Sequence, residues 1–377
     1  MRVRQVRRPS LARAAALLLA GAAFSFADQV EYTAYSFKDN KENTVATTSF
    51  SLAKTLWDRT MVLLDIELDQ LTIPALDGVT GASRPPRQGT REFRKSRGQI
   101  IGGLEQTLGS DTRLAMNYYF SQEVDYRSQA VVGTLTQEMF QKNFTIALRG
   151  QYTMDSVGEI TSSGALINRF KEVHQASITM TQLLTPTTIV RVGGDGYRLQ
   201  GFLSDPYRLV RAPSLSDPLA FENRAENHPN QRWRQAAWVE LSQYLRGLDG
   251  SVVANYRYYW DDWEIKSQTV QLKLNKYVTP DWIFSPEYRY YIQSGAWFYE
   301  DGNKGEFFTG DYKLTPFESN NMGAGITWYL RSLGRKRPGL EFLSNSSVAV
   351  LYFHYFNDAL GSNFSANVLE SRIKFTY

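Results

Sequence analysis

Three acidic residues at alternate positions are the first feature of this chain that suggests chemistry. Asp65, Glu67 and Asp69 lie in an apolar run that contains Leu64 and Ile66. In an extended strand alternate side chains share a face, so the three carboxylates would line up about 6.6 Å apart. This spacing favours either a cation-attracting stripe, with the option of a divalent-metal site, or a wet wall whose carboxylates form salt bridges.

The salt-bridged wall is the interpretation we favour, because one strand alone does not make a metal coordination shell. The expected partners are basic residues of other alternating segments, namely Arg113, Arg149, Arg257 and Lys273. We therefore predict no metal site and no cofactor.

Two arginines follow a glycine-rich stretch within a long loop at 71–97. Gly78 and Gly81 permit positive φ, and a Pro-Pro pair stiffens the chain before Arg87. Successive backbone N–H groups here can form an anion nest beside Arg84 and Arg87. The alternative, which we favour, is an ordered surface turn or a loop folded inward as a plug or constriction.

A second long loop at 201–231 contains Asp205 and Arg208. Ser-Asp-Pro occurs twice in it, at 204–206 and 216–218. Asp-Pro initiates turns, so two similar turns explain the repeat. Loops of this length are usually functional or disordered, so a lid or ligand-contacting loop over a pore is equally open.

Three histidines, His174, His228 and His354, are the candidate residues for hydrolytic chemistry, which needs a histidine beside a serine or an acid. Nothing in the spacing brings any of them to a nucleophile, and neither G-x-S-x-G nor H-E-x-x-H occurs. His228 lies in the 201–231 loop, where a barrel mouth is expected. We predict that the protein is not an enzyme, and keep an outer-membrane hydrolase as the last alternative.

The segments that must position these residues show strand periodicity. Apolar side chains alternate with polar or charged ones in 62–69, 113–121, 143–152, 251–260, 269–275 and 322–330. Tilted strands of about 9–11 residues are long enough to cross a bilayer. A soluble all-β sandwich also alternates, but its strands are shorter and its inner faces do not carry repeated charges.

Short and long connections alternate along the chain. Short links are predicted near 57–59, 109–111, 141–143, 185–187, 246–250, 279–281 and 332–339. Longer ones are predicted at 71–97, 155–171, 201–231 and 294–318, and lesser ones near 38–43, 122–129, 261–264 and 357–364. This asymmetry predicts an antiparallel up-and-down barrel of about sixteen strands, with short periplasmic turns and long extracellular loops.

The last segment fits the closing strand of such a barrel. Leu369, Ile373, Phe375 and Tyr377 fall on one side, and basic residues such as Lys374 fall on the other. A closing strand that ends on an aromatic residue resembles those that barrel assembly machinery recognises. Residues 366–377 are expected to pair with the first strand, around 30–37.

The N-terminus predicts export. Residues 1–27 have a basic start, an Ala/Leu-rich centre and small residues before Asp28, which is typical of a signal peptide cleaved after Ala27. This segment holds five of the 42 basic residues and none of the 38 acidic ones. The mature chain therefore has 37 basic and 38 acidic residues. That balance gives no case for nucleic-acid binding, which needs a clustered basic surface.

Composition agrees with a barrel in lipid. Mean hydropathy is −0.38, but a barrel strand gives only alternate residues to the membrane. Aromatic residues make up 14% of the chain, as interfacial girdles require. The absence of cysteine excludes thiolate metal sites and thiol catalysis.

The loop sequences LDGVTGASRPPRQ at 76–88 and FLSDPYR at 202–208 resemble a family of uncharacterised Gram-negative proteins, a domain of unknown function. The resemblance implies an outer-membrane barrel over residues 28–377 and carries no activity. We predict a channel or uptake barrel for a small polar solute or ion. The alternative is a non-transport barrel that scaffolds a periplasmic or surface partner. Expected partners are outer-membrane lipid and the assembly machinery.

Overall fold

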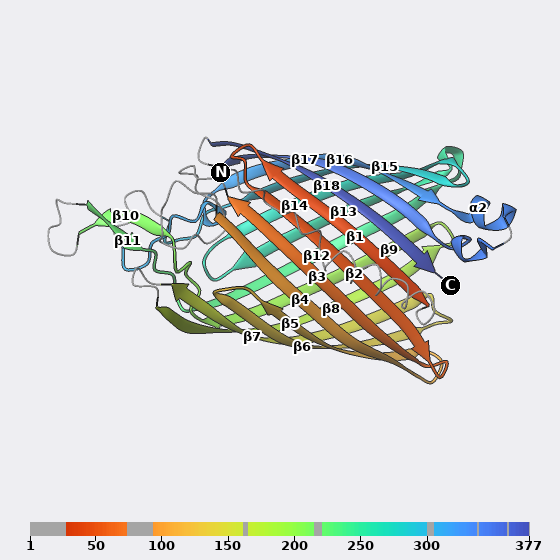
Figure 1. The fold of residues 1–377 in the computed structure, drawn as a ribbon, viewed down its shortest axis with the longest axis horizontal. Coiled ribbons are helices and arrows are strands. Elements are labelled where there is room, and N and C mark those ends of the chain that lie inside the picture. Colours follow the sequence, from red (N-terminus) through yellow and green to blue (C-terminus); the bar gives the residue numbers. More distant parts are fainter. Residues whose placement is uncertain are drawn as a thin grey trace, which may run out of the picture.

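The computed structural model describes residues 28–73, 93–160, 165–214, 221–299, 305–337, 339–359 and 362–376. Within them, sixteen strands form one closed antiparallel barrel, which confirms the predicted fold and strand number (Figure 1). The predicted signal peptide at 1–27 lies outside the described residues, as do Arg84, Arg87 and Tyr377. No helix in the described segments is long and apolar enough to cross a membrane.

The first barrel strands are β1 (Gln29–Asp39), β2 (Thr44–Leu56), β3 (Thr60–Ile73), β4 (Phe93–Leu108), β5 (Thr112–Gln122), β6 (Tyr126–Met139), β7 (Phe144–Ile160), β8 (Leu166–Thr185) and β9 (Thr188–Gly201). The others are β12 (Gln231–Leu245), β13 (Gly250–Asp261), β14 (Lys266–Thr279), β15 (Trp282–Gln293), β16 (Phe317–Tyr329), β17 (Ser347–Ala359) and β18 (Ser362–Thr376). A separate hairpin, β10 (Leu209–Pro213) and β11 (Phe221–Ala225), pairs with itself in the 201–231 loop.

The barrel closes where the first and last strands meet. β1 pairs with β18 antiparallel, from Gln29 opposite Thr376 to Asp39 opposite Ala366. This confirms the predicted closing pair. Full closure matters because lipid offers no partner to an open sheet edge.

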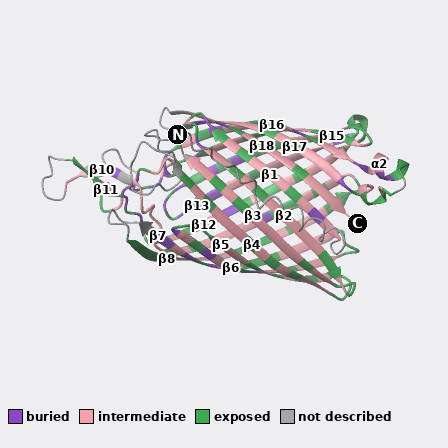
Figure 2. Ribbon diagram, in the orientation of Figure 1, coloured by how far each residue is buried: buried purple, intermediate pink, exposed green. Residues whose placement is uncertain are grey.

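Alternation divides the wall into two faces (Figure 2). On β3 the side chains of Val62 and Leu68 are exposed on the outside, while Asp65, Glu67 and Asp69 fall on the opposite face, toward the lumen. The same alternation leaves large apolar side chains exposed on the outside of almost every strand, for example Leu104, Leu148, Leu272 and Ile326. A wall with an apolar outside and a polar inside is the pattern of a membrane barrel.

One end of the barrel carries short turns. The β2–β3 turn holds Trp57 at φ 51° and Asp58 at φ 61°, and the β6–β7 turn places Gln141 at φ 58°. Between β16 and β17 the link is larger and includes the short helix α2 (Arg331–Lys336) and a 3₁₀ turn at Glu341–Leu343. Gln29 and Thr376 lie at this turn end, and the long connections lie at the other, the loop end (Figure 1).

Several predicted loops were too long. Both bounds predicted for the 71–97 loop are wrong, because β3 runs to Ile73 and β4 begins at Phe93. The 155–171 loop is wrong as well, since β7 extends to Ile160 and β8 starts at Leu166. Similar strand extensions shorten the links predicted at 122–129 and 357–364. Near the loop end the strands lose apolar alternation but keep their ladder hydrogen bonds, which the sequence pattern does not reveal.

Loops fold back over the wall at the loop end. Wall residues Ala236 and Tyr259 are buried with Trp263, Phe298 and Leu314 from the connections after β13 and β15. The Gln293 side chain donates to the carbonyls of Lys313 and Thr315 at 2.9 and 2.7 Å, which holds the β15–β16 connection against the wall.

Candidate functional site

The acidic stripe of β3 is partly neutralised by an arginine that the sequence reasoning assigned to a loop. Arg97, on β4, lies 2.7 Å from Glu67 and donates to Asp69 at 2.6 Å through Nε. Thr47 of β2 also donates to Asp69, at 2.6 Å. The stripe is therefore a paired wall over Glu67 and Asp69, while Asp65 has no ion-pair partner among the described residues.

The partners expected for this stripe lie elsewhere. Arg113 pairs with Glu138 at 3.3 Å and Lys273 lies 3.8 Å from Glu287, so both expectations are wrong. Arg149 donates to Gln151 at 2.8 Å, and the Arg257 guanidinium lies 5.7 Å from the centre of the Tyr259 ring. Within the described segments no group of three or more His, Cys, Asp and Glu is arranged to hold a metal ion.

A lumen cavity of about 560 Å³ lies along the wall from β3 to β7. Its lining includes Asp65, Asn117, Tyr119, Arg149 and Gln151, a mixture of charged, amide and phenol groups. Beside the apolar side chains of Ile101, Ala130 and Val132, these groups offer hydrogen bonds to a polar solute.

The second predicted region, Asp205 and Arg208, is built around one buried cation. Arg208 lies 3.0 Å from Asp311, 3.5 Å from Asp205 and 3.7 Å from Glu226. Its side chain is 10% exposed, and that of Glu226 is fully buried. Arg208 therefore joins the 201–231 loop to the β15–β16 connection.

The electrostatics of this cluster favour the charged forms. Burial alone lowers the pKa of Arg208, but Asp311, Glu226 and Asp205 outweigh it, so the pKa is raised. Burial alone raises the pKa of Glu226, yet His228, the Asp205 N–H and Arg208 hold it below its ordinary value. A cation that satisfies three carboxylates stabilises the cluster only while all partners stay in place.

His228 lies at the mouth of the barrel, as expected, and supports the same cluster. Its Nε2 is 3.4 Å from Glu226 and its Nδ1 is 3.1 Å from the Leu203 carbonyl. The ring packs against Trp263 and Phe298, with centroids 5.5 and 5.4 Å away. These contacts fit a structural role for this histidine.

Residue Tyr207 reaches the other side of the mouth. Its hydroxyl donates to Asp125 at 2.7 Å, in the link between β5 and β6. Lys95 also contacts Asp125, at 2.7 Å. Since the β5–β6 and β15–β16 links lie on opposite sides of the strand ring, the adjacent residues Tyr207 and Arg208 place segment 205–208 across the loop end.

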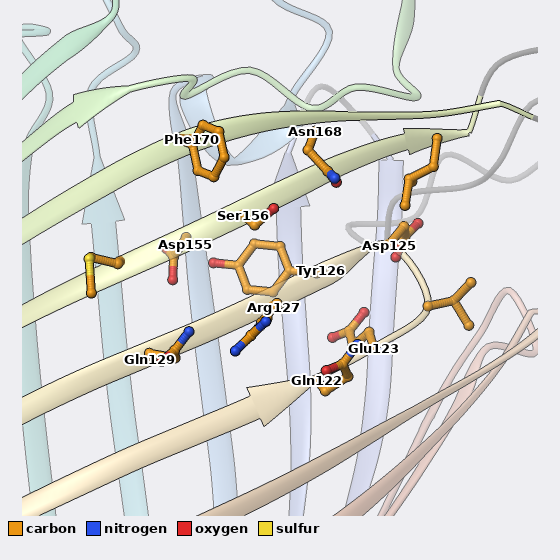
Figure 3. Close-up of a pocket in the computed structure, with 13 residues that line it drawn as sticks. Gln122, Glu123, Asp125, Tyr126, Arg127, Gln129, Asp155, Ser156, Asn168 and Phe170 are labelled. Atoms are coloured by element: carbon orange, nitrogen blue, oxygen red, sulfur yellow. The ribbon is translucent and has the colours of Figure 1, made fainter.

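A second cavity, of about 460 Å³, lies beside Asp125 near the tops of β5 to β8 (Figure 3). The Tyr126 hydroxyl is directed toward Asp155, which Lys171 contacts at 2.9 Å. Outward-facing residues such as Met154 and Phe170 complete the lining. The cavity therefore lies at the loop end of the barrel wall, where inward-facing and outward-facing side chains both contribute to its lining.

Sequence reasoning missed three members of these clusters: Arg97, Glu226 and Asp311. Arg97 shares the alternation of Gln99 and Ile101, so extending β4 by that parity would have placed it in the lumen. Nothing in the sequence signals the contact of Arg208 with Asp311, because the two residues lie in different loops.

Comparison with known families assigns the chain. Residues 77–346, more than half of the chain, match the family described as "Protein of unknown function (DUF3570)". The chain belongs to this family. That description names no activity, so for this family member the function has to be argued from geometry. No protein with curated function matches it.

Solved structures similar to this family member share little of its sequence. The siderophore receptor PirA from Pseudomonas aeruginosa is 12% identical with a TM-score of 0.44, over 87% of this chain and 56% of that one. The ferric enterobactin receptor PfeA from Pseudomonas aeruginosa is 12% identical with a TM-score of 0.49, over 88% and 53%. The chain thus spans about half the length of these receptors. Acinetobacter baumannii OccAB1 is 8% identical with a TM-score of 0.47, over 92% and 95%.

Proposed function

We propose that this protein is an outer-membrane barrel that acts as a channel or uptake barrel for a small polar solute or ion. The observation that carries the proposal is the two-faced wall, in which the same strands present apolar side chains outside and charged side chains inside. Closed barrels of sixteen strands are wide enough to enclose an aqueous path. Charged lumen faces would serve no purpose in a dry core.

Outward-facing tyrosines support insertion in a bilayer. Four of them lie within hydrogen-bond distance of an amide on the next strand: Tyr118 with Gln129, Tyr256 with Gln268, Tyr288 with Asn320 and Tyr352 with Asn367. In each pair the amide is two residues nearer the loop end than the residue directly opposite the tyrosine. The four hydroxyls thus all point toward the loop end, as tyrosines do at a lipid–water boundary.

Toward the turn end, two outward-facing tryptophans mark the other edge of the apolar band. Trp282 and Trp328 stack with ring centroids 5.3 Å apart and an interplanar angle of 3°. Indole rings favour the interface, where an apolar body meets a wet edge. The four tyrosines, directed toward the loop end, and the tryptophan pair near the turn end therefore support a band of lipid contact between them.

Reconstitution into planar bilayers tests the channel function. We expect stepwise conductance from the purified, folded barrel, and none from a heat-denatured sample or from detergent alone. A correctly folded barrel that leaves the bilayer sealed at all voltages would contradict the proposal.

A scaffold is the second candidate, and one observation favours it. The β10–β11 hairpin pairs only with itself among the described strands and projects beyond the loop end (Figure 1). A projecting hairpin with backbone edges on both sides suits the addition of a partner strand. Cross-linking in intact envelopes distinguishes the two, because a stoichiometric partner together with a sealed barrel supports the scaffold.

A further inference from the structure

We propose that Arg234, Arg257 and Arg289 form an anion-binding ladder on one wall of the lumen, and that the solute is a small organic anion carrying a carboxylate. The inference rests on the channel function proposed above and names the class of its solute. It starts from the observation that these three lumen arginines have no carboxylate partner among the described residues.

Most other basic side chains of the lumen wall are neutralised. Those in ion pairs with carboxylates are Lys95, Arg97, Arg113, Lys171, Arg191, Arg232, Lys273 and Arg372. Arg149 on β7 and Lys374 near the turn end of β18 also lack such a partner in the described part of the chain. In the described part of the chain, cations without a carboxylate partner gather on β12, β13 and β15, within four consecutive strands.

Tyrosines hold two of the three ladder arginines, Arg234 and Arg257, in place of carboxylates. Arg234 Nε donates to the Tyr259 hydroxyl at 3.0 Å, and its guanidinium lies 5.7 Å from the centre of the Tyr197 ring. Arg257 lies 5.7 Å from the centre of the same Tyr259 ring. A ring face orients a guanidinium and leaves its charge uncompensated.

Strand register arranges the three arginines as steps. Arg234 lies opposite Asp261 on β13, and Arg257 is four residues closer to the turn end, about 13 Å along the strand. Across β14, Arg257 and Tyr291 share the level of Thr269. Arg289 is two residues further toward the turn end, about 7 Å along β15. The ladder therefore descends from the loop end into the lumen.

Nearby carboxylates are occupied, with one exception. Asp261 is taken by Arg232 and Tyr259, and Glu287 by Gln271 and Lys273. Asp195, opposite Ala236, has no ion-pair partner among the described residues. The ladder thus keeps a local excess of positive charge with a single acid at its edge.

The chemistry of the steps selects the solute. A guanidinium donates two parallel hydrogen bonds to a carboxylate, and the fit adds geometric selectivity to charge. Several sites in series let a solute bind and still leave, which conduction requires. The β3–β4 wall lies seven to eight strands round the ring from β13. It differs because Arg97 offsets only one of the two charges of Glu67 and Asp69, and because Asp65 and Glu105 are further acids without an ion-pair partner in the described residues.

Succinate titrated into the detergent-solubilised barrel by calorimetry tests the ladder directly. We expect saturable binding that the double variant R257Q/R289Q weakens about tenfold or more. The control K374Q, which removes a lumen cation off the ladder that also lacks a carboxylate partner in the described residues, should leave binding unchanged. The variant R257K/R289K keeps the positive charges but loses the planar guanidinium groups, so its affinity for succinate should lie between those of the wild type and R257Q/R289Q. Gel mobility of unheated samples checks that each variant is folded.

Bilayer recording separates this inference from the channel function. We expect anion preference in a KCl gradient and block by succinate, both reduced in R257Q/R289Q and enhanced in D195N. If the barrel binds succinate but does not conduct, the result supports the anion-binding ladder and contradicts the channel function. A barrel that conducts, yet binds no succinate or responds equally to K374Q and R257Q/R289Q, would contradict the ladder and support the channel.

Discussion

The Tyr207 hydroxyl donates a 2.7 Å hydrogen bond to Asp125, which joins the 201–231 loop to the β5–β6 link across the mouth of the barrel. The next residue, Arg208, contacts Asp311 in the β15–β16 connection on the far side. Two adjacent side chains therefore connect three loops above the lumen. We call segment 205–208 the crossbar.

Removing the phenol hydroxyl tests the crossbar at one end. Tyr207→Phe keeps the ring and deletes the bond to Asp125, which keeps its contact with Lys95. We expect the crossbar to lose about 1–2 kcal/mol of stability against local opening. Faster hydrogen exchange of the backbone amides near 204–208 measures this. Tyr256→Phe, on the outer surface, is the control and should leave those amides unchanged.

Removing the central cation should have a larger effect. Arg208→Met leaves Asp205, Glu226 and Asp311 without their shared partner, and breaking a buried ion pair costs about 3–5 kcal/mol. We expect the loops to open locally while the barrel stays closed. Limited proteolysis should cut the 201–231 loop rapidly, with unheated gel mobility unchanged. An uncut loop would show that Arg208 does not hold the crossbar.

Acid should loosen the same cluster. The folded-state pKa of Glu226 lies below its ordinary value of 4.5, so its ionised form stabilises the cluster above that pH. This contribution is lost as the pH falls through the lowered pKa. Amide exchange near the crossbar, corrected for intrinsic rates, should therefore accelerate below pH 4.5. Glu226→Gln should be loose at neutral pH and less sensitive to acid.

The β3–β4 wall offers a prediction on ion selectivity. Arg97→Gln releases Glu67 and Asp69 into the lumen without altering the strand register. We expect the reversal potential in a KCl gradient to shift toward cation preference. The triple variant that also carries E67Q and D69N should reverse this shift and pass the wild-type value, because the wild type keeps one net negative charge over the three residues and the triple variant keeps none. If the single variant does not shift, those carboxylates do not face the ion path.

Adjacent residues on β14 test which face meets lipid. Leu272 is 48% exposed on the outside, whereas Gln271 contacts Glu287 in the lumen. Arginine on the lipid face of a barrel near mid-bilayer costs about 2–4 kcal/mol. Leu272→Arg should reduce folding into lipid vesicles, measured by urea titration, and Gln271→Arg should not. Equal effects would contradict the assignment of the two faces.

Period-2 alternation made the barrel predictable, because lipid outside and water inside impose the same pattern on every spanning strand. The pairing of Gln29 with Thr376 followed from the need for closure. The loop boundaries did not follow, since above the lipid the strand that carries Arg97 has no apolar face to reveal it. Partners such as Asp311 for Arg208 depend on how distant loops meet, which no local pattern encodes.

Single-channel recording of the folded barrel in a planar bilayer tests the central claim most directly. We expect discrete conductance steps, and a reversal potential in a KCl gradient that indicates a preference for anions. A folded, inserted barrel that shows no steps at any voltage, in the wild type and in the Arg208→Met variant alike, would contradict it.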